Sequence, residues 1–234
     1  MKHFFIFNGI NSIDKNITLL NYTPIFLPQN NFYFTRIPGK DGSLRRGDNA
    51  KQDIIINCDV VMSGEVSDIN YYNYWLQQRG ELRFWDMLEK YYIGEVVGEV
   101  PATKKKKWLE MQLNFRCHPI KYGITRTFNI TDNPTIYNLG TYPTKGMITV
   151  DITANVDHIQ VTLQNTGEFI YLEHDFIPGE IVTIDLEEET AYKNGYSIMK
   201  DCYLESDFFE IPVGEFKILV SSGNATLKYT ERWL

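Results

Sequence analysis

The chain alternates apolar and polar residues with a period of two over much of its length. In each alternating segment the apolar side chains fall on one face and mainly polar ones on the other, which is typical of an antiparallel strand with one buried face. The clearest segments are residues 54–62, 111–117, 148–152, 159–163, 182–186 and 216–220. Strands at such short spacing predict an all-β protein built of sandwiches, because a βαβ fold would place a helix between successive strands.

One helix is predicted among these strands, over residues 68–79. Ser67 is a good N-terminal cap, Asp68 suits the positive end of the helix dipole, and Gly80 suits the position after the last turn. Apolar side chains recur on one face at spacings of three and four, namely Ile69, Tyr72, Trp75 and Leu76. We therefore expect an amphipathic helix of about three turns that packs on the side of a sheet.

Residues 22–52 interrupt the alternation, and we expect them to form a long irregular arm or loop. The segment contains Pro24, Pro28, Pro38, Gly39, Gly42 and Gly47, and the aromatics Phe32, Tyr33 and Phe34 are expected to be exposed. Its candidate assembly residues are Arg36, Lys40, Asp41, Arg45, Arg46 and Asp48. Long loops in compact domains are usually functional or become ordered by a partner. The alternative, that the prolines and glycines only make turns, stays equally open.

A long hairpin over residues 94–107 is the second candidate surface. Pro101 and a run of lysines separate two strand-like segments, and the run Lys104, Lys105, Lys106 and Lys107 is expected at the tip. A basic tip can bind an acidic partner or touch DNA. A solvated tip without a partner is the simpler alternative, because like charges repel one another and favour exposure.

Length and a change of pattern together predict two domains. A chain of 234 residues suffices for two domains of ordinary size. The strand that ends at His118 and Pro119 gives way to a polar stretch, after which the strands are shorter and more regular. We place the first domain at residues 1–124 and the second at residues 125–234.

Composition narrows the range of partners. The chain has 30 acidic and 23 basic side chains, a net charge of −7, which argues against a protein that grips nucleic acid. The same charge suits a surface that DNA slides past, since acidic groups repel phosphate. Cys58, Cys117 and Cys202 are odd in number and far apart, so we expect free thiols and neither a disulfide framework nor a zinc site. No stretch approaches the ~20 apolar residues of a transmembrane helix.

No catalytic residue, metal site or cofactor site is predicted. The sequence contains no nucleophile elbow, phosphate-binding loop, dinucleotide fingerprint or His-Glu-x-x-His helix. Glu173, His174 and Asp175 are consecutive, but neighbouring residues of a strand point to opposite faces and do not converge on one metal. The acidic run at residues 187–189 is interpreted as a solvated strand end or turn, and not as a glycosidase carboxylate pair.

Short motifs follow one another along nearly the whole chain. The first half contains FIFNG (residues 5–9), PGKDG (38–42), LRFWD (82–86), YYIG (91–94) and LNFRCHP (113–119). The second half contains NLGTYP (138–143), GEIVTID (179–185), AYKNG (191–195), IPVG (211–214) and YTERW (229–233). Each motif alone is only turn and strand chemistry, but their collinear order resembles the distal tail protein family of siphophages that infect Gram-positive hosts.

The resemblance implies a tail-tube-like β-sandwich with one flanking α-helix in the first domain and a galectin-like β-sandwich in the second. It implies a homo-oligomer in the virion tail, in which six first domains close a ring and each arm reaches onto a neighbouring subunit. The ring would join the tail tube protein to a tail-associated hub or fibre protein. DNA would pass through the channel without specific binding, and neither a membrane nor a cofactor would take part.

Two other functions remain as alternatives. A galectin-like sandwich in a chain rich in Tyr and Trp permits a carbohydrate-binding module that attaches the virion to host cell-wall polysaccharide. The second domain is compact, without room for an inserted carbohydrate-binding module such as some relatives carry, and this favours a scaffold. An enzyme such as a wall hydrolase would have to show turnover on purified cell wall.

Overall fold

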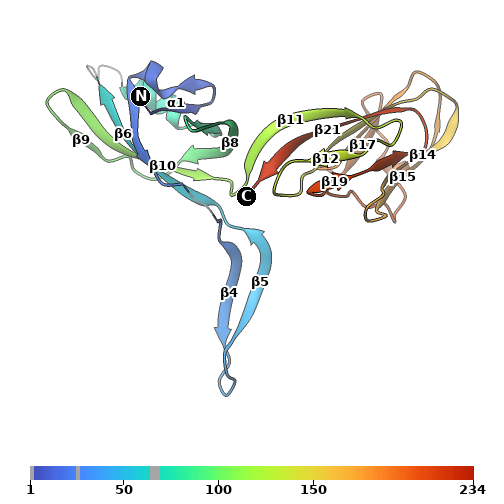
Figure 1. Ribbon diagram of the computed structural model, residues 1–234, viewed down its shortest axis with the longest axis horizontal. Coiled ribbons are helices and arrows are strands. Elements are labelled where there is room, and N and C mark those ends of the chain that lie inside the picture. Colours follow the sequence, from blue (N-terminus) through green and yellow to red (C-terminus); the bar gives the residue numbers. More distant parts are fainter. Residues whose placement is uncertain (1–2, 25–26, 64–68) are drawn as a thin grey trace. The chain divides into compact units, whose positions relative to one another are not determined.

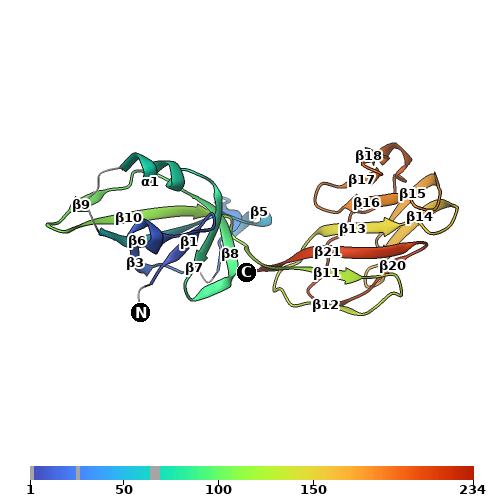
Figure 2. The ribbon, with the colours of Figure 1, turned by 90° about the horizontal axis from the view of Figure 1, so that it is seen from above.

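The structure is a computed structural model that describes residues 3–24, 27–63 and 69–234. The chain divides into two compact units, residues 1–122 with Leu234 and residues 123–233, which we call the first and the second unit. The predicted boundary, between residues 124 and 125, lies two residues further along. The all-β fold class is confirmed, because both units are built mainly of strands and the described ranges contain one short α-helix (Figures 1 and 2).

Apart from the separate hairpin of β4 and β5, the first unit is built of one sheet that folds over onto itself. Its elements are β1 (Phe5–Phe7), β2 (Ile10–Asn11), the 3-10 helix η1 (Ser12–Lys15), β3 (Ile17–Tyr22), β4 (Asn30–Arg36), β5 (Ser43–Lys51), β6 (Ile54–Ser63), α1 (Ile69–Leu76), β7 (Gly80–Phe84), β8 (Met87–Val96), β9 (Ala102–Lys104) and β10 (Trp108–Cys117). Strands β3, β6 and β10 lie side by side, and β9 extends the sheet beside β10. Strand β8 pairs with both β10 and β7, and β7 pairs with β1, so the chain returns over the first strands.

The core of the first unit lies between these folded layers. The apolar face of β6 is buried as its alternation predicts, and Cys58 pairs in register with Leu113 of β10. From the other layer, the rings of Phe5 and Phe7 meet Phe115 edge-on, with centroids 5.7 and 5.4 Å apart. Burial of this apolar and aromatic area drives the packing of the two layers.

The predicted helix is present but shorter than expected. It ends at Leu76 and not at Arg79, and its Trp75 side chain donates a hydrogen bond to the carbonyl oxygen of Phe7 at 2.9 Å. The prediction that Gly80 follows the helix was wrong, because Gly80 is the first residue of β7. A Cβ at this position would lie 1.6 Å from Oδ1 of Asn8, so close packing explains the glycine. The predicted capping residues 67 and 68 lie outside the described residues.

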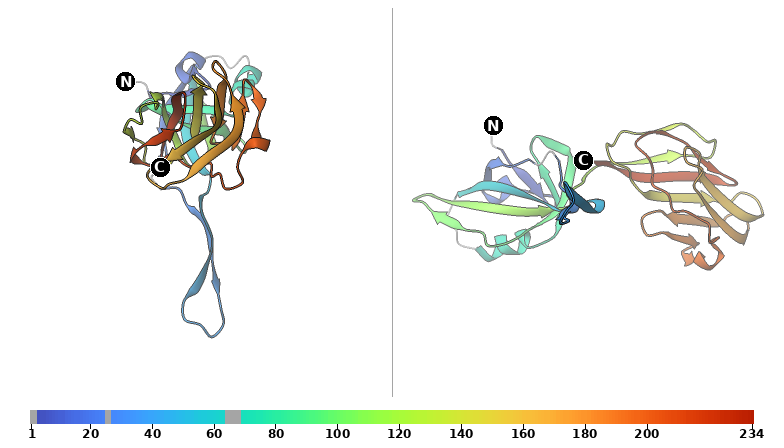
Figure 3. Two further views of the ribbon diagram at one scale, coloured as in Figure 1. Left: turned by 90° about the vertical axis from the view of Figure 1, so that its right-hand side faces the viewer. Right: turned by 90° about the horizontal axis from the view of Figure 1, so that it is seen from below.

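The prediction of an irregular arm was also wrong in part. Residues 30–51 form an antiparallel hairpin of β4 and β5, which Figures 1 and 3 show as a narrow ribbon that ends in a loop. The prolines and glycines that suggested irregularity lie before the hairpin, in its loop and at one bulge. We keep the name arm for residues 29–52.

The second unit is a β-sandwich. Its elements are β11 (Lys121–Asn129, from Gly123 onwards), β12 (Ile136–Asn138), β13 (Gly146–Asp151), β14 (Val156–Leu163), β15 (Phe169–Phe176), β16 (Ile181–Asp185), β17 (Thr190–Lys193), β18 (Tyr196–Ser197), the 3-10 helix η2 (Met199–Asp201), β19 (Gly214–Phe216), β20 (Ile218–Val220) and β21 (Asn224–Trp233). One sheet has the order β18-β17-β16-β13-β21-β11 (Figure 2). A second has the order β15-β14-β20, and β12 pairs with β19.

The apolar faces of these sheets form one core. Ile148, Ile159 and Ile184 come from three different strands of the predicted alternating segments, and all three are fully buried in the same cluster. At the edge of this core the buried carboxylate of Glu231 accepts a hydrogen bond from Nε of Arg126 at 2.6 Å. The sandwich is therefore confirmed, whereas the likeness of the first unit to tail-tube proteins and of the second to galectins stays a prediction.

Candidate assembly surfaces

A bulge shapes the arm near its base. The strands pair Phe34 with Arg45 and Phe32 with Gly47, and the register shifts between Asn30 and Phe32. Gly47 has a φ of +125°, and a Cβ there would lie 2.2 Å from the carbonyl oxygen of Asn31. Only glycine fits this conformation and this close approach of the two backbones. The local sequence thus builds a bulged hairpin where its composition alone suggested a loop.

Aromatic side chains cover much of the arm. The rings of Phe32 and Phe34 meet edge-on at 5.4 Å, and the guanidinium of Arg45 lies 4.1 Å from the centroid of Phe32. On the other face Tyr33 is 61% exposed, and Phe34 itself is 64% exposed, which confirms the expected exposure of both. Phe32 is only half-buried. Because these aromatics are exposed, they are available to contact a partner. A two-stranded hairpin is also only marginally stable on its own.

The arm is basic. All six predicted assembly residues are exposed: Arg36, Lys40, Asp41, Arg45, Arg46 and Asp48. Between residues 29 and 52 the chain has five basic and two acidic side chains, in contrast to its acidic total. Asp48 has a local role as well, because its carboxylate accepts a hydrogen bond from the backbone N–H of Ala50 at 3.1 Å.

The arm is anchored where it joins the sheet. The backbone N–H of Gln52 donates to the carbonyl oxygen of Gln29 at 2.8 Å, so the two ends of the arm lie side by side. Asp53, the next residue, forms an ion pair at 2.8 Å with Arg116 of β10. The base is therefore held to the first unit while the outer part stays exposed.

The four predicted lysines of the second surface lie at a tight turn between β9 and β10, which we call the lysine turn (residues 104–107). The backbone N–H of Lys105 donates to the carbonyl oxygen of Trp108 at 2.9 Å, and its Nζ lies 3.7 Å from a carboxylate oxygen of Glu110. All four side chains are exposed. The position agrees with a basic hairpin tip, and its binding role stays a prediction.

The structure does not bring the arm and the lysine turn together. The arm leads into β6 at Ile54, which pairs with Cys117, while the lysine turn precedes Trp108, which pairs with Ser63. These pairs mark the two ends of β6, a strand of ten residues. At ~3.3 Å per residue the ends lie about 30 Å apart. The two surfaces are therefore separate sites.

An apolar groove in the first unit was missed by the sequence analysis. It has a volume of about 210 Å³, and its lining includes Met62, Tyr72, Leu76, Val100, Leu109 and Met111. These residues come from β6, α1, β10 and the segment before β9. Only the folded sheet assembles them, so no single stretch of sequence signals the groove.

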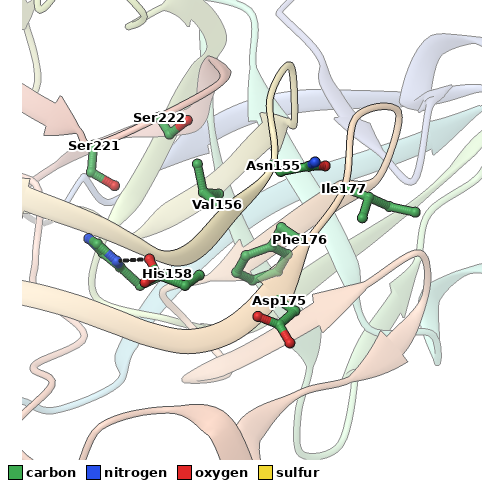
Figure 4. Close-up of a pocket in the computed structure, with 9 residues that line it drawn as sticks. Asn155, Val156, His158, Asp175, Phe176, Ile177, Ser221 and Ser222 are labelled. Carbon is green, nitrogen blue, oxygen red and sulfur yellow. Dashed lines mark hydrogen bonds and ion pairs between the residues drawn. The ribbon is translucent and has the colours of Figure 1, made fainter.

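A hollow of about 630 Å³ lies in the second unit, between the ends of β14 and β15 and residues 221–222 (Figure 4). In it Asp157 and Nδ1 of His158 lie 2.6 Å apart, and this hydrogen bond holds the pKa of Asp157 below its usual range. The ring of His158 stacks on Tyr171 at 5.1 Å, and Tyr171 meets Tyr203 edge-on at 6.0 Å. Polar groups thus adjoin a row of partly exposed rings.

The residues considered for catalysis or metal binding diverge in the structure. Nδ1 of His174 lies 2.9 Å from a carboxylate oxygen of Asp201, whereas Asp175 borders the hollow of Figure 4. Residues 187–189 lie in the turn after β16, as predicted, and Asp185 accepts the hydrogen bonds from the first two of their N–H groups. In the described ranges, no group of three or more His, Cys, Asp or Glu residues is placed to hold a metal ion.

The thiols are free, as predicted. Burial raises the pKa of Cys117 to about 12 and moves that of Cys58 in the same direction, so neither is a nucleophile at neutral pH. Across residues 3–24, 27–63 and 69–234, no helix has the length and apolar character to span a membrane.

Known proteins resemble both the sequence and the fold. Residues 139–233 match the family model described as "Siphovirus-type tail component, C-terminal domain". The distal tail protein of Bacillus phage SPP1 is 23% identical over 210 residues, which cover 85% of this chain and 83% of that protein. The crystal structure of SPP1 Dit, described as a paradigm of the hub adsorption apparatus in phages that infect Gram-positive bacteria, matches 100% of both chains with a TM-score of 0.86 at 18% identity. The family model, the curated relative and the solved structure agree with one another, and together they support a siphophage distal tail protein, a structural component of the tail tip.

Proposed function

We propose that this chain is a ring subunit of the virion tail tip. Six copies form the ring through their first units, and the ring joins the tail tube protein to a tail-associated hub or fibre protein. The observation that carries the proposal is the arm, a basic hairpin that exposes Tyr33 and Phe34. A contact between two different surfaces of identical subunits closes into a ring when its rotation is right. The arm supplies one such surface.

The arm is the element to remove in a test. Because Gln29 and Gln52 are hydrogen-bonded to each other, a two-residue Asn-Gly turn can replace residues 30–51 without opening the sheet. Native mass spectrometry is expected to show hexamers for the full chain and monomers for the shortened one, with equal circular dichroism spectra. Tyr196→Ser, which alters an exposed aromatic of the second unit, is the matched control and keeps the hexamer. Hexamers of the shortened chain would refute the role of the arm.

The channel is proposed to let DNA pass without holding it. The net charge of −7 belongs to the chain as a whole, and it disfavours tight binding of duplex DNA to the assembled protein. A gel-shift titration with duplex DNA at physiological salt is expected to show no complex with the assembled protein. A saturable complex with a strong salt dependence would contradict this part of the proposal.

Carbohydrate binding is the second candidate function, favoured by the hollow of Figure 4 and the row of rings beside it. Aromatic faces next to planar polar groups suit sugar rings, and His158 and Tyr171 are the side chains to alter. Calorimetry with host cell-wall polysaccharide is expected to show binding that His158→Ala and Tyr171→Ala abolish and Tyr192→Ala preserves. Binding that survives both changes would exclude this surface.

A further inference from the structure

We infer that the hollow of the second unit and the row of rings beside it take a neutral polysaccharide and reject polymers that carry phosphate groups. The inference rests on the proposed carbohydrate-binding function, and it names the chemical class of the ligand. It is carried by the face on which the rings lie, by the segment that holds them and by the charge around them.

Strand register places the rings on the outward face of the sheet of β14 and β15. The core buries Leu172 of β15, and side chains two residues apart on a strand share a face. Its neighbours Tyr171 and Glu173 therefore lie on the opposite, outward face. His158 of β14 pairs with Glu173 and joins this face, where its ring stacks on Tyr171 at 5.1 Å. Because His158 also lines the hollow, the row of rings begins at the wall of the hollow.

A short segment holds the row in place. Residues 202–207, which we call the strap, run along the edge of β15: the N–H of Tyr203 donates to the carbonyl oxygen of Tyr171 at 2.9 Å. The N–H of Tyr171 donates in turn to the hydroxyl of Ser206 at 3.0 Å. The ring of Tyr203 meets Tyr171 edge-on at 6.0 Å and is 49% exposed. A platform that is already held in place loses little conformational freedom when a ligand binds.

The hollow adds polar groups next to this platform. Its lining includes Asn155, Asp175 and Ser222 (Figure 4). Within the described ranges, the structure shows no hydrogen bond or ion pair for these three side chains, so they are available to the hydroxyl groups of a sugar. The volume of about 630 Å³ lies within the ~300–1,000 Å³ that is typical of small-molecule sites.

The charge around the rings distinguishes between two classes of wall polymer. Strands β14 and β15, the strap and residues 221–222 contain no lysine or arginine but five acidic residues: Asp157, Glu173, Asp175, Glu205 and Asp207. The hydrogen bond to His158 holds the pKa of Asp157 below its usual range, so this carboxylate is ionised at neutral pH. Phosphate groups would meet like charges here, which lowers affinity. Hydroxyl groups of a neutral sugar can instead donate hydrogen bonds to the carboxylates.

Binding of the full chain to immobilised glycans tests the inference. One set of spots carries oligosaccharides of glucose, galactose, rhamnose or N-acetylglucosamine, and a second set carries poly(glycerol phosphate) of similar length. The chain is expected to bind at least one neutral oligosaccharide and to bind poly(glycerol phosphate) at least about fivefold more weakly at low salt. Tighter binding to poly(glycerol phosphate) would overturn the inference and leave the carbohydrate-binding function. Absence of binding to every probe would overturn both.

A charge reversal provides an independent readout. Asp175→Lys, at the border of the hollow, is expected to improve binding to poly(glycerol phosphate) by about fivefold. Glu188→Lys makes the same change at an exposed position in the turn after β16, whereas Ile177 of the hollow precedes that strand. This control is expected to leave the binding unchanged. Equal effects of the two variants on binding to poly(glycerol phosphate) would overturn the inference.

Removal of a ring tests the platform. Tyr203→Ala is expected to weaken binding to the neutral oligosaccharide by about tenfold or more, as loss of a central aromatic contact does. Tyr137→Ala, at an exposed position of β12, is the matched control and keeps the binding. Both variants are expected to keep the wild-type circular dichroism spectrum. Neutral-sugar binding that survives Tyr203→Ala would overturn the inference.

Discussion

At the scale of single residues, Gly47 determines the shape of the arm. Its φ of +125° and the 2.2 Å that would separate a Cβ from the carbonyl oxygen of Asn31 leave no room for a side chain. Gly42 in the loop has a φ of +77° but open space around it. The two glycines are therefore needed for different reasons, one for close approach and one for backbone conformation alone.

Gly47→Ala is predicted to disrupt the hairpin without unfolding the first unit. An alanine at this position would strain the backbone by more than about 1–3 kcal/mol, which exceeds the marginal stability of an isolated hairpin. Hydrogen exchange is expected to show lost protection across β4 and β5, with unchanged protection in β6. Gly42→Asn is the control, because asparagine tolerates a left-handed backbone. Equal protection in both variants would show that the bulge does not depend on Gly47.

The ion pair of Arg126 and Glu231 yields a prediction for the second unit. The carboxylate side chain of Glu231 is 4% exposed and that of Arg126 is 35% exposed. Arg126→Ala is expected to destabilise the unit by about 2–3 kcal/mol, because it leaves a buried carboxylate without its partner. The loss is smaller than for a fully buried pair, because Arg126 is itself partly exposed. Urea denaturation measures the loss. The double variant Arg126→Ala, Glu231→Gln is expected to recover part of it, and an unrecovered loss would point to packing instead.

Burial of ionisable groups predicts lower stability of the first unit in alkali. Burial raises the pKa of Tyr92 and that of Cys117 to about 12, and burial with a hydrogen bond to Asp86 also raises that of Tyr22. A raised pKa means that the folded state keeps the proton longer. The stability is thus full below the unfolded pKa values, near 9 for Cys and 10 for Tyr, and falls as pH rises toward 12.

Tyr92→Phe isolates one of these groups. Ionisation of the Tyr92 phenol alone is expected to lower the free energy of unfolding by about 2 kcal/mol by pH 12. The variant lacks the phenolic group and is expected not to show this loss. Denaturation curves recorded between pH 8 and 12 give, for each chain, the slope of the free energy of unfolding against pH. Tyr137→Phe, at an exposed position of the second unit, is the control with the wild-type slope. A Tyr92→Phe slope equal to the wild type would assign the alkaline loss to other groups.

At the scale of elements, alternation predicted the strands well and the arm poorly. The segments at 54–62 and 159–163 are strands because their apolar face meets a core, which a period of two reveals. In β4 both faces are largely exposed, so burial imposes no alternation there. The hairpin depends instead on a bulge glycine and a loop, features that composition alone also associates with irregular structure.

The lysine turn is predicted to be dispensable for ring formation. Its four side chains are exposed, and it lies at the end of β6 opposite the arm. Replacing all four lysines by serine is expected to leave both the hexamer and the melting temperature unchanged. A measured loss of affinity for an acidic tail partner would assign the turn to that partner. Loss of the hexamer would instead place the turn within the ring contact.

At the scale of the whole molecule, charge divides unequally between the units. Residues 123–233 contain 17 acidic and 7 basic side chains, whereas the rest of the chain contains 13 acidic and 16 basic ones. The net negative charge therefore belongs to the second unit. A first unit with a basic arm and a strongly acidic second unit are suited to different partners, because electrostatic complementarity governs partner choice.

The sequence predicted the β class, but not the groove. Collinear motifs report turns and strand ends, which are local, whereas the groove combines β6, α1 and β10 and exists only after the sheet has folded. The same limit applies to the hollow near His158, whose walls come from residues 155–158, 175–177 and 221–222. Contacts of this kind depend on register, which single motifs do not encode.

Native mass spectrometry of the full chain, beside the chain in which Asn-Gly replaces residues 30–51, tests the proposed ring most directly. We expect a closed species of six subunits for the full chain and a monomer for the shortened chain at the same concentration. A full chain that remains monomeric at high concentration, even with its tail partners present, would contradict it.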